Sequence, residues 1–339
     1  MDNFSVIRDT HKYVDLKKLK GSWKLWRSYN RSKSTGRAIV KALPYAVSIE
    51  PTTACNLGCP ECPSGLKKFS RNTGNLKHEL FTNIIDQMKD HLIYLTFYFQ
   101  GEPFINPDFL DMVTYAHKHK IYTATSTNAH FLNEANAIRT IESNLDKLIV
   151  SVDGTTQEVY EKYRINGSLD KALDGIREVV KWKRRLKSKT PKIVMQYLVV
   201  RHNEHQIEDA KALAKDLGVD EIQFKTAQIY NHENGSELIP QQDKYSRYRL
   251  KSNGEYEIKN ELVNQCWRMW HSCVITWDGH VVPCCFDKDA DFKFGDLKID
   301  SFRDIWYSDE YMKFRNSILK SRSQIEICKN CTEGTKVWA

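Results

Sequence analysis

The 339-residue sequence has no continuous apolar run of about 18 residues, the minimum length for a membrane-spanning helix. It begins without an apolar signal segment, so we expect its nine cysteines to lie in a reducing cytoplasm, where thiols more often bind metals than form disulfides. It also has no low-complexity tract and no repeat of fixed period. With 41% hydrophobic and 28% charged residues, the chain can bury a sizeable core as two domains, or as one barrel with an extension.

Outside its first 45 residues the chain has no net charge. Residues 1–45 contain eleven Lys or Arg and three Asp, which accounts for the whole formal charge of +8. Any surface that attracts anions therefore belongs to this N-terminal arm. The arm has no recognisable nucleic-acid-binding module, so we expect no nucleic-acid partner.

Within the arm, apolar residues recur at helical spacing between basic ones: Leu16, Leu19, Trp23 and Trp26. A basic helix with Trp on one face can lie on an anionic membrane surface, which would make residues 1–30 a membrane-peripheral segment. Alternatively, the apolar stripe packs against the rest of the protein and the charges face water. We favour the packing interpretation.

From residue 46 the sequence alternates short β-rich runs with amphipathic segments. The predicted strands are residues 46–50, 93–99, 121–125, 147–152, 193–200 and 221–225. The predicted helices are residues 78–90, 107–118, 132–142, 169–186 and 204–217. Such alternation indicates parallel strands with right-handed crossovers. It predicts an α/β fold in which residues 46–240 form a partial (β/α)6 barrel. The basic arm (residues 1–45) precedes the barrel, and a smaller domain (residues 241–339) follows it.

Three cysteines follow the first predicted strand in a Cys-x3-Cys-x2-Cys pattern: Cys55, Cys59 and Cys62. Three thiolates on one loop can hold three irons of a cubane cluster, which leaves the fourth iron open to a reacting molecule. A structural zinc site would need a fourth ligand nearby, and the spacing is not the paired Cys-x2-Cys of zinc ribbons. A disulfide framework suits a small secreted domain better than this chain.

The three-cysteine pattern resembles the radical S-adenosylmethionine (radical SAM) superfamily, whose open iron binds the amine and carboxylate of that cofactor. One departure is Glu61, which stands where the family often has an aromatic residue. After the second strand, Gly101, Glu102 and Pro103 are similar to the family's Gly-Glu-Pro motif, which implies acceptors for the cofactor's ammonium group. The alternative for this motif is a plain turn.

The resemblance implies further cofactor contacts after the third and fourth strands, where parallel barrels collect their chemistry. The residues are Ser126, Asn128, Ser151, Asp153 and Arg164. The Arg164 guanidinium would pair with the cofactor carboxylate, although a lone Arg can also be a surface charge. Asn203 follows the fifth strand, where it can cap the next helix. It is interpreted first as a structural residue and second as a neighbour of the cofactor.

The other six cysteines lie in the C-terminal part of the chain. Four of them fit Cys-x12-Gly-x4-Cys followed by Cys-x2-Cys: Cys266, Cys284, Cys328 and Cys331. This arrangement resembles the SPASM/Twitch extension of radical SAM enzymes, which holds an auxiliary iron–sulfur cluster. Asp278-Gly279 predicts a hairpin turn that brings Cys266 and Cys284 together. A predicted helix over residues 302–318 would then bring Cys328 and Cys331 back to them.

Four thiolates complete one [4Fe-4S] site, although four thiolates can also bind zinc. Cys273 and Cys285 are left over. Cys285 adjoins Cys284 and can replace it as a ligand, but a free buried cysteine is the commoner case.

The sequence therefore predicts a radical SAM oxidoreductase with S-adenosylmethionine, one SAM-binding [4Fe-4S] cluster and one auxiliary cluster. It would need an external one-electron donor of the flavodoxin or ferredoxin type. One auxiliary cluster and a compact chain favour oxidation of a small molecule, such as a sugar or lipid-linked intermediate. One alternative is a peptide maturase, which would need a separate recognition protein. The second alternative is a non-catalytic iron–sulfur protein, an electron carrier or sensor. Such a protein would not need polar residues at the ends of its strands, so their presence argues against it.

Overall fold

The computed structural model describes residues 9–331 and divides the chain into two compact units. Unit 1 takes in the chain up to Thr53, Ser70–Ala124 and the chain from Leu262. Unit 2 takes in Ala54–Phe69 and Thr125–Glu261. The cysteine-rich loop after the first strand thus belongs to unit 2, and the C-terminal cysteines belong to unit 1. The predicted domain boundaries at residues 45 and 240 stay predictions.

The sheet of unit 1 is built around its first strand. β1 (Ala46–Ile49) pairs in parallel with β2 (Tyr94–Phe97) and, on its other edge, with β9 (Ser272–Ile275). β10 (Val281–Val282) then pairs antiparallel with β9. The predicted C-terminal hairpin is therefore present, and it also extends the parallel sheet. That pairing covers an edge of β1 that would otherwise present unpaired backbone groups.

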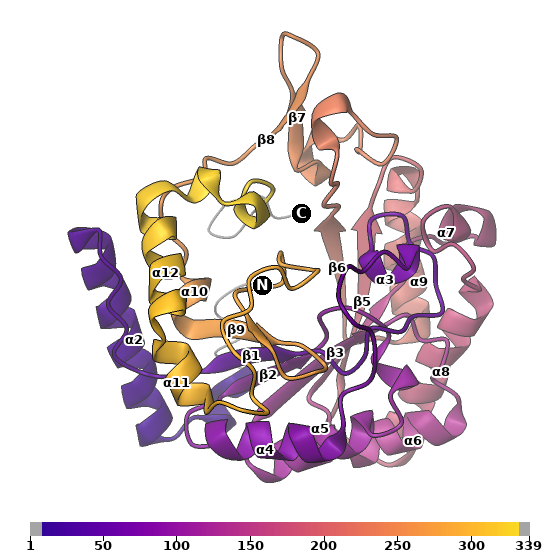
Figure 1. The fold of residues 1–339 in the computed structure, drawn as a ribbon. Helices are drawn as coiled ribbons and strands as arrows, with labels where there is room; N and C mark the ends of the chain where they lie inside the picture. The colour runs from indigo at the N-terminus through magenta and orange to yellow at the C-terminus, as the bar shows by residue number, and fades with distance from the viewer. Residues whose placement is uncertain (1–8, 332–339) are drawn as a thin grey trace. The chain divides into compact units, whose positions relative to one another are not determined.

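The helices of unit 1 cover this sheet. α4 (His78–Met88) and α5 (Phe109–Lys118) lie side by side and bury one apolar face each, with Phe81 and Val113 among the buried side chains (Figure 1). The helix predicted over 302–318 is instead two helices, α11 (Phe302–Tyr307) and α12 (Asp309–Ser321). The single-helix prediction is wrong because Ser308 leaves helical geometry and caps α12, accepting a hydrogen bond from the Tyr311 amide at 3.2 Å.

Unit 2 contains the later strand–helix repeats. β3 (Tyr122–Thr127) crosses the boundary between the units, and β4 (Lys147–Ser151), β5 (Lys192–Val199) and β6 (Glu221–Thr226) continue in parallel. Every residue of β4 is buried, as expected for a parallel strand covered on both faces. The connecting helices are α6 (Glu134–Glu142), α7 (Gln157–Tyr163), α8 (Leu169–Arg185) and α9 (Ile207–Leu217). All six predicted barrel strands are found within two residues of their expected bounds, and the α/β fold class is confirmed.

The remaining described elements are short. Unit 2 also holds α3 (Pro63–Leu66) and an antiparallel pair, β7 (Tyr248–Leu250) and β8 (Tyr256–Ile258), within the stretch expected to be irregular. Unit 1 also holds α10 (Arg268–His271). Single 3-10 turns are η1 (His11–Tyr13), η2 (Pro103–Ile105), η3 (Glu204–Gln206), η4 (His232–Asn234), η5 (Asp243–Tyr245), η6 (Arg322–Gln324) and η7 (Glu326–Cys328).

The basic arm forms one long helix of unit 1, α2 (Leu16–Thr35), with Asp15 as its N-cap and Gly36 ending it at φ 65°. It packs through Leu25 and Tyr29, whose ring centroid lies 5.1 Å from that of Trp270. The stripe that we expected to pack is instead exposed: Leu16 is 76% exposed and Trp26 56%. The packing interpretation is wrong, because the helix uses its opposite face for burial. Among residues 9–331, no helix is long and apolar enough to cross a membrane.

Candidate functional site

The three-cysteine loop of unit 2 folds tightly against its own backbone. The Cys62 amide donates to the Cys59 carbonyl at 3.3 Å, and the Gly58 amide donates to the Ile165 carbonyl at 2.8 Å. At Gly65 a Cβ atom would lie 2.6 Å from the Cys59 amide nitrogen, so only glycine fits there without a shift of the backbone. The chain after Cys62 then turns directly into α3.

The three thiols sit at the margin of an apolar cluster. Cys59 is buried with Leu57, Tyr163 and Val200, whereas Cys55 and Cys62 are partly buried and pack against the same cluster. Burial raises the pKa of the Cys59 thiol, and the nearby Arg164 guanidinium opposes that rise. The loop therefore presents one enclosed and two more accessible sulfurs.

Two of the predicted cofactor contacts, Asp153 and Arg164, bond to each other in unit 2. Arg164 Nε donates to Asp153 Oδ2 at 2.5 Å, and both side chains are largely buried. Arg164 Nη1 also lies 3.7 Å from the Cys59 sulfur. Asp153 Oδ1 accepts from the Leu198 amide at 2.7 Å, so this carboxylate is fixed from two sides. The Arg164 guanidinium thus lies next to the cysteine loop, and the buried Asp153 carboxylate holds it there.

Asn128 is also next to the cysteine loop. Its amide nitrogen donates to Asn56 Oδ1 at 2.8 Å and lies 4.0 Å from the Cys55 sulfur. The neighbouring His130 was not singled out from the sequence. Its Nε2 accepts from the Ser168 amide at 2.8 Å, and its other ring nitrogen lies 3.0 Å from the Asn128 carbonyl. His130 therefore ties the turn after β3 to the start of α8.

Three further predicted residues lie on the strands or turns of unit 2. Ser126 is in the last part of β3 and Ser151 ends β4, so both are near the carboxyl ends of parallel strands. Asn203 makes no capping bond to the following turn, so the cap prediction is wrong, although the side chain does have the structural role that we expected. Its carboxamide instead donates to the Asp153 and Leu198 carbonyls at 3.0 and 2.8 Å, because it is buried between these two strand ends.

In unit 1 the Gly101-Glu102-Pro103 segment forms a turn after β2. Gly101 has φ 76°, a left-handed conformation that favours glycine. Glu102 is 2% exposed, and its Oε1 accepts from the Phe104 amide at 3.3 Å at the start of η2. A capping bond of this kind agrees with the turn interpretation and leaves the second carboxylate oxygen to other partners.

The four C-terminal cysteines are near one another in unit 1. Burial raises the pKa of the Cys284 thiol well above its usual range, and the neighbouring thiols of Cys285, Cys266 and Cys331 raise it further. Cys328 and Cys331 are both buried, and burial raises the pKa of Cys328 to about 11. Thiols that lie this close to one another are suited to bind a metal group as thiolates, because the metal's positive charge replaces their protons.

Arg322 accompanies this cysteine set. It is 1% exposed, its Nη2 lies 3.2 Å from the Cys331 sulfur, and its Nη1 donates to the Gln265 carbonyl at 2.9 Å. A buried guanidinium needs an anionic partner, and thiolates supply one. No spacing pattern pointed to Arg322, because it precedes the last cysteine pair on a separate turn.

The two leftover cysteines differ in their surroundings. Cys273 is fully buried inside β9, and burial raises its pKa to about 12, as expected for an inert core thiol. Cys285 is exposed. Within residues 9–331, no group of three or more His, Cys, Asp or Glu side chains is placed as a site for one metal ion.

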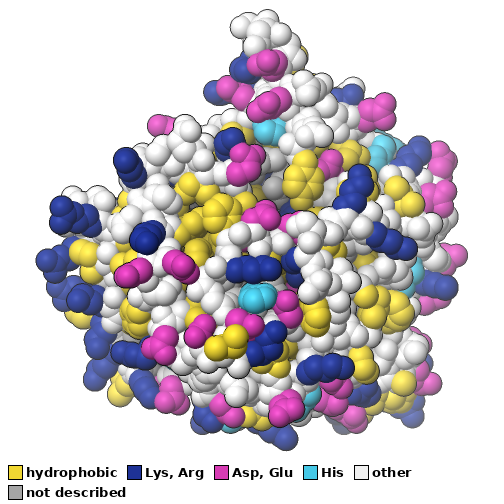
Figure 2. Space-filling view, viewed as in Figure 1, with side chains coloured by type: hydrophobic (Ala, Val, Ile, Leu, Met, Phe, Trp, Pro, Cys, Tyr) yellow, Lys and Arg dark blue, Asp and Glu magenta, His cyan; other side chains and the backbone are white. Residues whose placement is uncertain are grey.

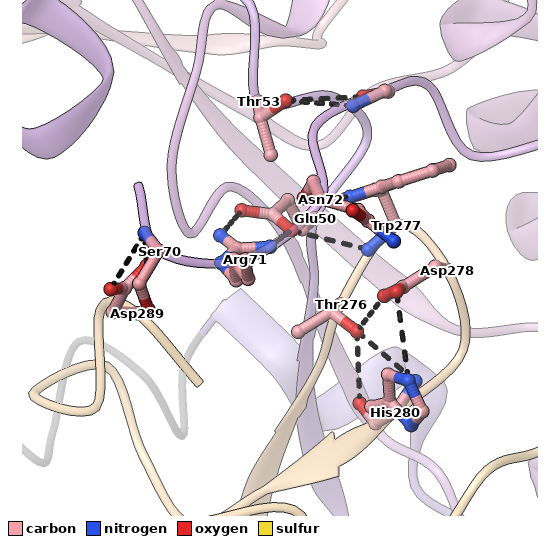
Figure 3. Close-up of polar contacts among 11 residues, drawn as sticks. Glu50, Thr53, Ser70, Arg71, Asn72, Thr276, Trp277, Asp278, His280 and Asp289 are labelled. Carbon is pink, nitrogen blue, oxygen red and sulfur yellow. Dashed lines mark hydrogen bonds and ion pairs between the residues drawn. The ribbon is translucent and has the colours of Figure 1, made fainter. Parts of the chain in front are cut away.

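A polar clamp in unit 1 holds the segment that follows the cysteine-rich loop in the chain. Arg71 donates to both oxygens of Glu50 at 2.6 and 2.8 Å, and the two side chains are 5% and 0% exposed. The Trp277 amide donates to the same carboxylate at 3.2 Å. Figure 3 shows these three groups converging between the end of β1 and the hairpin of β9 and β10.

Neighbouring contacts reinforce the clamp. The Ser70 amide donates to the Asp289 carboxylate at 2.9 Å, and the Trp277 indole donates to the Asn72 carbonyl at 3.1 Å (Figure 3). A Cβ on Gly74 would lie 2.6 Å from the Trp277 ring, so the indole also packs on this segment. Residues 70–74 are therefore fixed by the C-terminal part of unit 1.

Comparison with known proteins identifies the family. Residues 49–222 match the family model described as the radical SAM superfamily, and residues 266–332 match an iron–sulfur cluster-binding domain named SPASM. The first match covers more than half of the chain. The protein belongs to the radical SAM superfamily. Its cofactors are accordingly S-adenosylmethionine and [4Fe-4S] clusters, including an auxiliary cluster.

Two curated relatives carry different functional names. The chain is 26% identical over 298 residues to the tungsten-containing aldehyde ferredoxin oxidoreductase cofactor-modifying protein of Pyrococcus furiosus, covering 79% of this chain and 82% of that protein. It is 31% identical over 175 residues to the mycofactocin maturase MftC of Mycobacterium ulcerans, covering 52% of this chain and 45% of that protein.

Two solved structures share the fold. BtrN in complex with AdoMet and 2-DOIA is 17% identical with a TM-score of 0.53, covering 87% of this chain and 95% of that one. Streptococcus suis SuiB bound to the precursor peptide SuiA is 14% identical with a TM-score of 0.64, covering 91% and 75%. At these identities the likeness shows the fold alone.

The clamp predicts an asymmetric response to charge removal. Arg71→Met should lower the free energy of unfolding by about 3–5 kcal/mol, because it leaves the Glu50 carboxylate buried without its counter-ion. The double variant Glu50→Gln with Arg71→Met should recover part of that loss. Thermal denaturation of the purified protein measures both.

Lys89→Met is the matched control for Arg71→Met, since it breaks an ion pair to Asp86 in which both side chains are substantially exposed. It should leave the denaturation midpoint nearly unchanged. An Arg71→Met protein as stable as the control would show that the clamp contributes nothing.

Proposed function

We propose that this enzyme removes a hydrogen atom from its substrate and completes an oxidation with the help of its auxiliary cluster. In this proposal Cys55, Cys59 and Cys62 hold the SAM-binding cluster. The auxiliary ligands are Cys266, Cys284, Cys328 and Cys331. The residues proposed to contact S-adenosylmethionine are Gly101, Glu102, Pro103, Ser126, Asn128, Ser151, Asp153 and Arg164.

The observation that carries the proposal is the presence of two thiol sets of different size in one chain. The first offers three sulfurs on one loop, which is the number that leaves an iron open. The second offers four, which closes the ligand shell of a cluster and suits it to pass electrons rather than bind a reactant. Arg164 beside Cys59 and Arg322 beside Cys331 fit this assignment, because each supplies positive charge to an anionic cluster.

The electron balance follows from these two sets. Reductive cleavage of S-adenosylmethionine uses one electron from an external donor and supplies a 5′-deoxyadenosyl radical, which takes a hydrogen atom from a substrate carbon. Forming a double bond at that carbon then requires the loss of one proton and one more electron. The four-cysteine site would accept that electron, and a flavodoxin- or ferredoxin-type protein would exchange electrons with the enzyme.

For the substrate we propose a small molecule, such as a sugar or lipid-linked intermediate. The alignment that covers 79% of this chain and 82% of a protein named for modifying a cofactor supports this proposal. A peptide or protein substrate is the second candidate, favoured by the higher local identity to MftC.

We further propose a cytoplasmic location, in contact with the periphery of a membrane. Thiolate ligands of iron–sulfur clusters persist in a reducing compartment, which supports this location for a chain with two sets of cluster-binding cysteines. The electron donor and the membrane contact both remain proposals.

The ligand assignment predicts a specific iron count. Replacing Cys55, Cys59 and Cys62 together by Ala should abolish 5′-deoxyadenosine formation and leave about four irons per chain on the second thiol set. Adding Cys284→Ala to that variant should lower the iron content further, whereas adding Cys273→Ala should not. Anaerobic reconstitution followed by iron analysis and product chromatography measures both quantities.

Two results would contradict this assignment. Retained 5′-deoxyadenosine formation in the triple variant would remove the first set from catalysis. One zinc and no iron in the triple variant would make the second set structural.

The two substrate classes can be separated before the substrate is identified. A cell extract that contains the substrate should stimulate 5′-deoxyadenosine formation by the reconstituted enzyme. If the substrate is a small molecule, the stimulation should survive exhaustive protease digestion of the extract and passage through a small-pore membrane. Loss of stimulation after digestion would instead favour the peptide candidate.

A further inference from the structure

One face of α2 is apolar and uncovered in unit 1. Leu16 and Leu19 are 76% and 56% exposed, and Trp23 and Trp26 are 53% and 56% exposed. At about 100° per residue these four side chains fall on one stripe of the helix. Two tryptophans and two leucines on one exposed stripe are a contiguous apolar surface rather than scattered single residues.

Basic side chains surround the stripe. α2 carries six exposed Lys or Arg and no acidic residue: Lys17, Lys20, Lys24, Arg27, Arg31 and Lys33. The Arg27 guanidinium lies 4.7 Å from the centroid of the Trp23 ring, so charge and aromatic surface are in direct contact. Lys17 pairs with Asp90, and both side chains are exposed. Figure 2 shows Lys and Arg gathered with apolar side chains along the edge where α2 lies in Figure 1.

The opposite face holds the helix firmly in unit 1. Leu25 is 0% exposed, and Tyr29 packs on Trp267 and Trp270. Lys18 is buried, and its Nζ donates to the Lys120 carbonyl at 2.9 Å. This lysine is therefore part of the packing and not of the basic surface, and its burial lowers its pKa. The helix is thus a fixed element that presents its apolar stripe outward.

We propose that α2 docks the enzyme on an anionic lipid bilayer, with Trp23 and Trp26 at the level of the headgroups. Tryptophan is enriched at the membrane–water interface, because its ring is apolar with one polar edge. Lysine and arginine beside it attract the negative surface of the leaflet. A helix with an apolar stripe, a basic flank and no acid combines both forces.

Charge complementarity selects the membrane over other occupants of this face. The surface of an anionic bilayer is negative over its whole extent, so every exposed cation on α2 can contribute. A second copy of this chain would bring the same positive charges together, and like charges disfavour that contact. An acidic protein partner would also attract the basic side chains of α2. It would not offer the apolar layer that a bilayer offers to the four exposed apolar side chains.

The docking proposal adds a location to the proposed function and favours a lipid-linked substrate within it. It does not require the oxidation chemistry, because lipid binding can be measured without turnover. Failure of one proposal therefore leaves the other intact.

Co-sedimentation with lipid vesicles tests the proposal on the full-length, cluster-reconstituted protein. Vesicles of phosphatidylcholine and phosphatidylglycerol in equal parts should bind the protein, and vesicles of phosphatidylcholine alone should bind it far less. Added salt should release the protein, because counter-ions screen the attraction within a Debye length of about 10 Å. Trp23→Ala with Trp26→Ala should lower the partition coefficient by about tenfold or more, since the apolar contact is lost.

Matched variants separate the stripe from general surface effects. Lys20→Glu with Lys24→Glu should weaken binding strongly, whereas Lys171→Glu with Lys215→Glu changes net charge equally on exposed positions of α8 and α9 and should not. Ile299→Ala removes an apolar side chain that is 82% exposed and should leave binding unchanged.

Three outcomes would overturn the proposal: no binding to anionic vesicles, binding that salt does not weaken, or equal loss in the control variants. A dimer that Trp23→Ala with Trp26→Ala dissociates, seen by sedimentation velocity in the absence of vesicles, would assign this face to a second copy instead. All the variants change exposed side chains, so circular dichroism should show that each is folded like the parent.

Discussion

The parallel pairing of β1 on both of its edges is the constraint on which the rest of unit 1 depends. Ala46 is in register with Tyr94 of β2 and with Ser272 of β9, so strands more than 200 residues apart in the sequence are neighbours in the sheet. The cysteine-rich loop leaves the end of β1, and Cys284 follows the hairpin that β9 begins. The clamp of Glu50, Arg71 and Trp277 reinforces the same junction with a buried ion pair.

Charge is distributed according to task in this protein. Buried cations stand beside the sulfurs that we assign to clusters, as Arg164 beside Cys59 and Arg322 beside Cys331. The exposed cations of α2 surround an apolar stripe and face outward. The first arrangement compensates the negative charge of thiolate-bound clusters, and the second suits an extended anionic surface. Together they agree with our proposal that the enzyme performs radical chemistry next to an anionic lipid surface.

The sequence predicted local elements well and long-range ones poorly. The barrel strands are short apolar runs that end in polar residues, so their bounds could be found from pattern alone. The pairing of β9 with β1 could not, because nothing local specifies a partner far along the chain. The helical periodicity identified the apolar stripe of α2. It did not show whether the stripe is buried or exposed, because an apolar face can contact either a protein core or a membrane. The Arg164–Asp153 pair was likewise hidden, because each residue had been assigned separately to the cofactor.

The central claim is that the protein holds two clusters and that only one of them has an open iron. Electron paramagnetic resonance of the dithionite-reduced, reconstituted protein, recorded with and without S-adenosylmethionine, tests it most directly. The account predicts two cluster signals, of which the cofactor alters one and leaves the other unchanged. Loss of Cys55, Cys59 and Cys62 should remove the responsive signal only. A spectrum in which the cofactor alters neither signal, or in which only one cluster is present, would contradict the account.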